Sequence, residues 1–206
     1  MTSRRASRAE RRGVVVGLGR EEKPGRKKSF RRSRSTVLIV TNGEKTEMQY
    51  FEALKDDPWE RSYHVSFKRG DPRNLVREGS LEKANSGYDT VWCVCDVDHY
   101  EVSNLIREAR NLGVEVALSR PCFEVWLILH HKDFGRPLQN ANEAKHEIRK
   151  ILPRWDKASL RIEDFRDGIA AATSRAKKLT EPPLGNPSTD VWKVVELLRT
   201  PEEDDG

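Results

Sequence analysis

Carboxylates gather at two places in the chain, each directly after a run of apolar residues. Asp96 and Asp98 follow the run TVWCVC, and Glu44 and Glu47 follow the run TVLIV. Residues two apart on an extended chain point to the same side, so two such aspartates repel each other unless a cation lies between them. Oxygen ligands at this spacing suit Mg²⁺ or Mn²⁺. The alternative is a pair of solvated turn aspartates, one of which caps the next helix.

The stretch TNGEKTE (41–47) has a structural interpretation as well as a functional one. Thr41 and Glu44 have the spacing of a capping box, and Gly43 would permit a tight turn between a strand and a helix. Glu47 would be stabilised by the helix dipole even without a function. No phosphate-loop pattern G-x-x-x-x-G-K-[ST] is present, which excludes nucleotide binding of that type. Glu44 and Glu47 are therefore candidate catalytic residues with a structural alternative for each.

The segment PCFEVWLILHH (121–131) is apolar nearly all round, which predicts a buried helix. A carboxylate at Glu124 is unfavourable there unless it is paired, hydrogen-bonded or ligated, and a helix dipole explains it as well as a second metal does. His130 can be an acid–base group or a core histidine with satisfied nitrogens. Arg120 could bind a phosphate group, or it could be a solvated loop residue.

Strand patterns alternate with helix patterns in the first part of the chain. The expected strands are 36–41, 63–68, 90–95 and 115–119. The expected helices are 45–55, 72–84, 102–112 and 121–131. This order predicts an α/β core over residues 36–132, with about four mostly parallel strands flanked by helices. Ligands of such sheets bind beyond the carboxyl ends of the strands, so the acidic stretches are expected to meet at one edge.

After residue 132 the pattern is helical only. Helices are expected at 142–152, 169–179 and 189–198, the last capped by the cluster Ser188-Thr189-Asp190. These helices predict a helical C-terminal extension (133–200) that belongs to the same domain. Residues 201–206 read as an acidic frayed end.

Composition places the chain among globular proteins of one domain with appendages. It has 206 residues, of which 36% are hydrophobic and 34% charged. Because no apolar stretch approaches 18 residues and no signal-peptide pattern is present, we expect a cytoplasmic protein with no membrane partner. The three cysteines cannot all pair with one another, and we expect them to be core residues.

Positive charge is concentrated at the N-terminus. Residues 1–35 hold 13 Lys and Arg against three Glu, whereas the remaining residues hold 25 basic and 30 acidic side chains. Such a tail is expected to be disordered and to attract phosphate backbones, although a solubilising leader or an imprecise start codon explains it too. The acidic remainder would repel nucleic acid unless metal ions or local basic groups offset its carboxylates.

Four motifs together resemble those of one known family. They are GEKTE-x-x-YF (43–51), DVDH (96–99), SRPCFEVWLILHH (119–131) and NPSTDVW (186–192). They resemble the RloB-like, or AbiLii-like, proteins over about residues 36–200. The resemblance implies a Toprim-like fold, which is the metal-dependent phosphoryl-transfer fold of topoisomerases, primases and overcoming-lysogenization-defect nucleases. It also implies a role in phage defence or abortive infection, together with an ABC-type ATPase.

The resemblance assigns roles to several residues. Asp96 and Asp98 match the metal-binding D-x-D, Glu124 matches a second acidic position, and His130 matches the histidine of the helix. The implied activity is a nuclease that requires Mg²⁺ (or Mn²⁺) and acts on DNA or RNA, with tRNA among the candidate substrates. Three further residues at the same edge of the sheet are expected to contact nucleic acid, namely Lys45, His99 and Arg120.

The chain departs from the family pattern at one position. The family usually reads C-E-G-E-K-T-E at residues 41–47, and Asn42 replaces the glutamate that serves the metal and proton transfer. An amide oxygen can ligate a cation but cannot take a proton near neutral pH. Either Glu47 carries the metal role alone, or Glu44 substitutes, or catalysis is lost. The alternative function is therefore a weakened or inactive Toprim-like module that binds nucleic acid or a partner protein.

Overall fold

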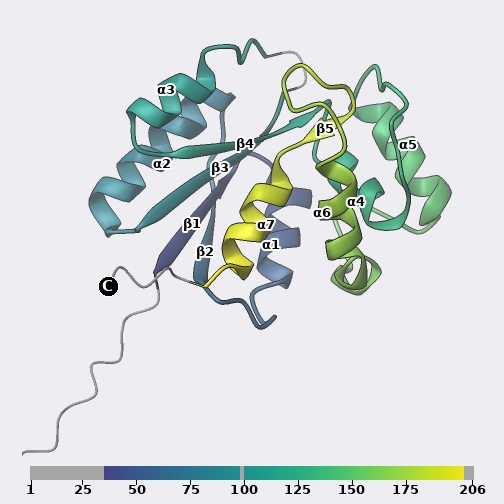
Figure 1. Cartoon of the computed structure of the whole chain (residues 1–206), viewed down its shortest axis with the longest axis horizontal. Helices are drawn as coiled ribbons and strands as arrows, with labels where there is room; N and C mark the ends of the chain where they lie inside the picture. Colours follow the sequence, from purple (N-terminus) through teal and green to yellow (C-terminus); the bar gives the residue numbers. More distant parts are fainter. Residues whose placement is uncertain (1–34, 98–99, 202–206) are drawn as a thin grey trace, which may run out of the picture. The chain divides into compact units, whose positions relative to one another are not determined.

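Figure 1 shows the computed structural model of the chain, in which residues 35–97 and 100–201 are described. These residues form a five-stranded sheet with the order β2-β1-β3-β4-β5. The strands are β1 (Thr36–Thr41), β2 (Ser62–Phe67), β3 (Thr90–Asp96), β4 (Glu115–Arg120) and β5 (Ser188–Thr189). The first four strands are parallel to their neighbours, and β5 is antiparallel to β4. The mixed α/β fold predicted from the sequence is confirmed, and it is consistent with a Toprim-like arrangement.

Seven α-helices surround the sheet in the described part of the chain. They are α1 (Thr46–Ala53), α2 (Pro72–Ser86), α3 (Leu105–Asn111), α4 (Glu124–His131), α5 (Ala141–Ile151), α6 (Ile169–Ala176) and α7 (Val191–Arg199). Two short 3₁₀ helices precede α6, at Ile162–Asp164 and Arg166–Gly168. None of these helices is both long enough and apolar enough to span a membrane.

Helices cover both faces of the sheet, which explains why β1 is apolar at every central position. Val37 and Ile39 face the larger core, and Leu38 and Val40 face the smaller one. The smaller core is completed by α2 and α3, whereas the larger core includes side chains of α1, α4, α5, α6 and α7. Figure 1 shows these helix groups on either side of the strands. A strand buried on both faces reads as a continuous apolar run.

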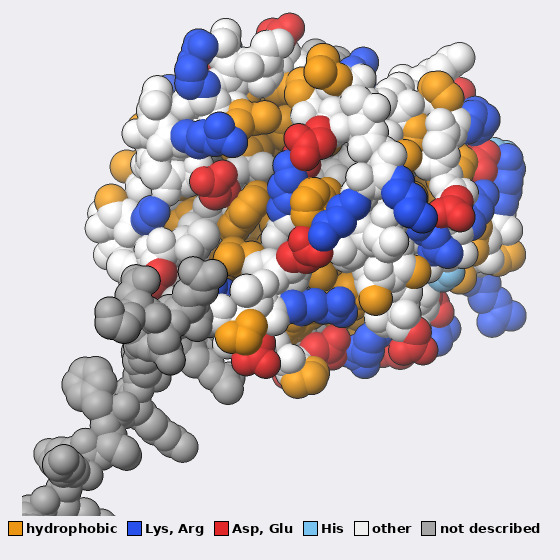
Figure 2. Space-filling view, viewed as in Figure 1, with side chains coloured by type: hydrophobic (Ala, Val, Ile, Leu, Met, Phe, Trp, Pro, Cys, Tyr) orange, Lys and Arg blue, Asp and Glu red, His pale blue; other side chains and the backbone are white. Residues whose placement is uncertain are grey.

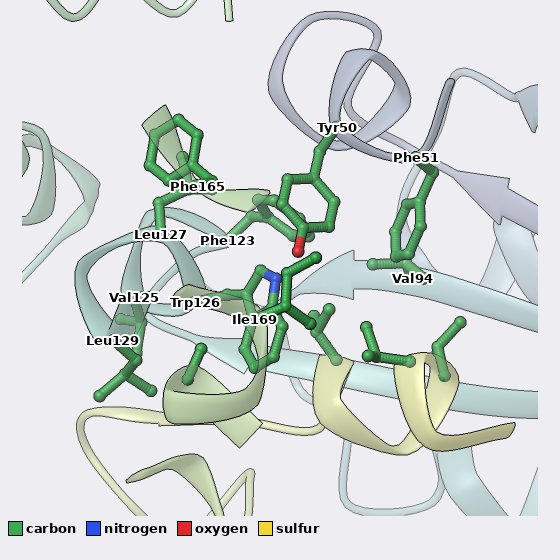
Figure 3. Packing of buried hydrophobic residues seen from close by; sticks show 14 of the residues in the cluster. Tyr50, Phe51, Val94, Phe123, Val125, Trp126, Leu127, Leu129, Phe165 and Ile169 are labelled. Carbon is green, nitrogen blue, oxygen red and sulfur yellow. The ribbon is translucent and has the colours of Figure 1, made fainter. Parts of the chain in front are cut away.

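Aromatic side chains join α1 to α4 in the larger core (Figure 3). The ring of Tyr50 lies edge-on to that of Phe51 at 5.3 Å and to that of Phe123 at 5.5 Å, measured between centroids. Trp126 and Phe123 are fully buried beside them. Such edge-to-face pairs stabilise a core beyond the area that they bury. The starts of α1 and α4 are thereby held side by side.

The strand order changes direction at β1, because the chain first adds β2 on one side and then adds β3 on the other. Ligands bind at such switch points, just beyond the carboxyl ends of the strands. The carboxyl ends of β1, β3 and β4 are neighbours in this sheet. Residues that follow these three strands are therefore brought to one place.

Some local predictions are wrong. The capping box at residues 41–44 is absent, because Thr41 ends β1 and its hydroxyl donates to the Gly43 carbonyl at 3.2 Å. Helix α1 instead begins after Lys45, with no side-chain cap. Strand β5 was not predicted, since two residues are too few to show a periodic pattern. The three cysteines are free and buried, as predicted.

Candidate functional site

Three carboxylates come from the ends of the three adjacent parallel strands. Glu47 lies in the first turn of α1, which follows β1. Asp96 is the last residue of β3, and Glu124 is the first residue of α4, which follows β4. The predicted convergence of the acidic stretches on one edge therefore holds for the carboxylates among the described residues. Asp98 and His99 lie outside the described residues.

Two of these carboxylates are buried and the third is partly buried. The exposed fraction is 2% for Glu47 and 1% for Glu124, while Asp96 is partly buried. Asp96 Oδ1 accepts a hydrogen bond of 2.8 Å from the backbone N–H of Phe123, which ties the end of β3 to the start of α4. Glu47 Oε2 and Glu124 Oε1 are buried without a hydrogen-bond donor. Buried oxygens of this kind are unfavourable unless a cation or another donor compensates for them.

Gly43 leaves the space that Glu47 occupies. The Glu47 carboxylate folds back over the α-carbon of Gly43, and a Cβ built there would overlap its carboxyl atoms. The glycine is therefore required for close approach rather than for a helix cap. Without it, the Glu47 side chain could not occupy its buried position at the end of β1.

Among the described residues, Lys157 forms an ion pair with one of these carboxylates. Its Nζ lies 3.7 Å from Glu124 Oε1, and its side chain is 37% exposed. The loop that carries it is held by Gln49 of α1, which donates to the carbonyl of Ala158 (3.1 Å) and accepts from the backbone N–H of Leu160 (3.0 Å). Sequence reasoning missed Lys157, because a lysine in a loop after α5 gives no periodic or motif signal that would connect it to Glu124.

The pKa values of the site reflect this crowding of acidic groups. Burial raises the pKa of Glu47, Lys157 opposes the rise, and Glu124 adds to it. Burial also raises the pKa of Asp96 well above its usual range, and the charges of Glu47 and Glu124 raise it further. Burial by itself lowers the pKa of Lys157, but the three carboxylates outweigh this effect and raise it. All four groups therefore belong to one electrostatic unit.

The donor chemistry of the site fits a hard divalent cation. All candidate ligands are carboxylate oxygens, which Mg²⁺ and Mn²⁺ prefer. When ionised, the three carboxylates and Lys157 leave a formal charge of −2, which one divalent cation would balance. As the side chains stand in the described parts of the chain, no three His, Cys, Asp or Glu residues are close enough to hold an ion. Ion binding would therefore require the side chains to reorient.

The remaining residues singled out by sequence lie around this unit. Glu44 and Lys45 are exposed at the turn before α1, and Asn42 is partly buried just after β1. Arg120 ends β4 and donates a hydrogen bond to the carbonyl of Pro183, so part of its guanidinium group is occupied by the loop before β5. Lys45 is thus the more accessible of these two candidate phosphate contacts.

His130 occupies a structural position. It is 5% exposed, and its Nδ1–H donates to the carbonyl of Trp126 at 2.8 Å. Its Nε2 must then accept the hydrogen bond of 3.1 Å from the Tyr50 hydroxyl. Burial lowers the pKa of His130 to about 3, so the ring is neutral at physiological pH. With both nitrogens engaged, His130 is not placed to act as the acid–base group considered from the sequence.

Comparison with known proteins gives one match. The model of a protein family described as RloB-like protein matches residues 37–198. No curated protein and no solved structure gives a significant match to the chain. The matched region begins in β1 and ends in α7, so it includes every carboxylate of the site.

Proposed function

The chain belongs to the RloB-like protein family, and from this premise we propose that it is a Mg²⁺- or Mn²⁺-dependent nuclease of Toprim type that acts on DNA or RNA. The observation that carries the proposal is the meeting of Glu47, Asp96 and Glu124 at the ends of three adjacent parallel strands. Phosphodiester cleavage by such a site needs stabilisation of the charge that develops on the phosphate, which a divalent cation supplies together with an activated water.

The chain's own residues have distinct parts in this proposal. Asp96, Glu47 and Glu124 would hold the cation once their side chains reorient, and Asp98 remains a candidate ligand. Lys157 balances the carboxylate charge that one divalent cation leaves over, and Gln49 keeps the loop of Lys157 against α1. Lys45, which is exposed two residues before Glu47, would contact a phosphate of the substrate. Because Asn42 cannot take a proton, a carboxylate of the site would have to accept any proton transferred at this edge.

The biological setting follows from the family resemblance rather than from the geometry. We propose a cytoplasmic effector of phage defence or abortive infection that works with an ABC-type ATPase. The nucleic acids to be assayed are therefore DNA, RNA and tRNA, with the ATPase present.

Substitution of Asp96 tests the proposal. Asp96→Ala should abolish cleavage that depends on Mg²⁺ or Mn²⁺, a loss of about 100-fold or more, because the cation loses a central ligand. Cleavage products would be measured on labelled DNA, RNA and tRNA, with circular dichroism to verify that the variant is folded. The matched control is Glu115→Ala, which removes an exposed carboxylate at the opposite end of β4 and should leave cleavage unchanged. Equal cleavage by the wild type and Asp96→Ala would rule the proposal out.

Asn42 favours a second function, in which the module binds nucleic acid or a partner protein without cleaving. Asn42 takes the place of the glutamate that the family usually has before the glycine. Asn42→Glu separates the two functions. If this variant cleaves and the wild type does not, the natural protein is a binding module whose site has lost its proton acceptor.

A further inference from the structure

A hollow on α5 is lined by two basic and two acidic side chains and is separate from the Glu47–Asp96–Glu124 site. It has a volume of about 490 Å³ and is lined by one stripe of the helix together with Arg136 and two asparagines. The stripe consists of Glu143, His146, Glu147 and Lys150, which lie three or four residues apart and so share one side of the helix. Figure 2 shows Lys and Arg side chains gathered at the edge of the molecule where α5 lies in Figure 1.

Glu147 holds in place the two cations that line this hollow, Arg136 and Lys150, and also Lys132 beside them. Its buried carboxylate receives Lys150 Nζ at 2.7 Å, Arg136 Nη2 at 3.1 Å and Lys132 Nζ at 3.4 Å. The hydrogen bond from Lys150 is the main reason why the pKa of Glu147 falls to about 2. The three cations keep 40% to 57% of their side chains exposed. One buried carboxylate thus orders three positive groups that still face solvent, which lowers the entropy lost when they bind an anion.

The charge around α5 is opposite to that of the rest of the described chain. Residues 132–154 contain six Lys and Arg against three Asp and Glu, whereas the other described residues contain 19 basic and 22 acidic side chains. An acidic body needs local basic groups before it can approach a polyanion. The region around α5 provides such basic groups, and they lie around a hollow.

The hollow is also connected to the carboxylate site. Lys132 follows the last residue of α4, and Glu124 is the first residue of that helix, so the two ends lie about 11 Å apart at 1.5 Å per residue. From the end of α5 the chain passes Trp155, against which Arg149 packs with its guanidinium 5.8 Å from the ring centroid. It then reaches Lys157, the ion-pair partner of Glu124.

We propose that this hollow binds the phosphate backbone of a nucleic acid and so holds the strand beside the carboxylate site. Arg136 and Lys150 make the phosphate contacts, with His146 and the asparagines around them. This inference rests on the proposed function for the identity of the bound polymer, but it concerns binding and not cleavage. It therefore has a test that needs neither metal nor turnover.

The test measures binding of a labelled DNA duplex and a labelled RNA single strand by fluorescence anisotropy in EDTA, over a series of salt concentrations, with the full chain. The variant Arg136→Gln/Lys150→Gln should weaken binding by about tenfold. It should also lower the slope of log K against log salt by about 1.4 to 1.8, since each lost phosphate contact removes about 0.7 to 0.9. The matched control is Arg77→Gln/Arg110→Gln, which removes two exposed arginines from α2 and α3 on the opposite face of the sheet.

A second variant tests the hollow independently, in case the first variant does not fold. His146→Glu adds a negative charge to the hollow without touching the ion pairs of Glu147, and it should weaken binding of both probes as well. Unchanged affinity and salt slope in both hollow variants, or an equal loss in the α2–α3 control, would overturn the inference. Binding that depends on the hollow while Asp96→Ala leaves cleavage unchanged would keep the inference and reject the nuclease.

Discussion

Gly43 has no side chain because the Glu47 carboxylate occupies the space beside its α-carbon. At the scale of single residues this is the clearest link between sequence and site. The motif GEKTE places a glycine four residues before a glutamate, and the turn folds the second over the first. Thr41 and Glu44 have the spacing of a capping box, but β1 continues through Thr41, so Thr41 cannot cap the helix.

Substitution of this glycine gives a prediction at the residue scale. Gly43→Ala should destabilise the protein by about 1 to 3 kcal/mol, because its Cβ overlaps the Glu47 carboxylate and one of the two must move. It should also weaken Mn²⁺ binding by about tenfold, measured by calorimetry. Gly135→Ala is the control, since a Cβ there meets nothing within 4 Å. Unchanged Mn²⁺ affinity in Gly43→Ala would contradict the placement of Glu47 in the site.

Strand β3 places Asp96, and two helices and a loop place the other charges of the site. Helix α1 contributes Glu47 to the carboxylates and, two residues later, Gln49 to the loop that carries Lys157. Helix α4 begins at Glu124, and Asp96 accepts a hydrogen bond from the backbone N–H of Phe123, the residue just before it. One side of the site is therefore fixed by the sheet, and the other by a loop that Gln49 holds through two hydrogen bonds.

Removal of that glutamine side chain tests the role of the loop. Gln49→Ala should lower the free energy of unfolding by about 1 kcal/mol, because two backbone groups of the loop lose their partner. Part of this loss should disappear when Lys157 is already replaced by Met, with a coupling of about 0.5 kcal/mol or more in a double-mutant cycle. Urea denaturation measures the free energy of unfolding of the wild type, the two single variants and the double variant. Gln139→Ala, at an exposed glutamine, is the control; strict additivity of Gln49→Ala and Lys157→Met would show that the two are independent.

At the scale of the whole molecule, the carboxylates of the site lower the stability of the folded state when no cation is bound. The pKa of Asp96 is higher in the folded state than its ordinary value of 3.8, mainly because of burial. Below that ordinary value both states are protonated and the group has no effect on stability. As the pH rises above it, the unfolded state ionises first, so the folded state loses stability relative to the unfolded one. A bound cation would reverse this loss.

The fall in stability with rising pH leads to a prediction for the whole chain. In EDTA, Asp96→Asn should be more stable than the wild type at pH 7, because burial raises the pKa of Asp96 and the amide has no ionisation for burial to oppose. The difference should vanish near pH 4, because the amide oxygen of the substituted side chain can still accept from the Phe123 N–H and only the ionisation is removed. Thermal unfolding at several pH values measures the effect. Addition of Mn²⁺ should stabilise the wild type more than the variant; equal stabilisation of both would exclude Asp96 as a ligand.

The sequence alone determined the α/β class, the order of the four parallel strands and helices along the chain, and the acidic residues at the strand ends. These features are encoded locally, because apolar periodicity reports burial and parallel strands must end at the same edge. Only the tertiary structure decided the partners of those residues. Gln49 and Ala158 are 109 positions apart, and Tyr50 and His130 are 80 apart, so no local pattern connects them. For the same reason the tertiary structure alone could make His130 a neutral core residue and place Lys157 beside the carboxylates.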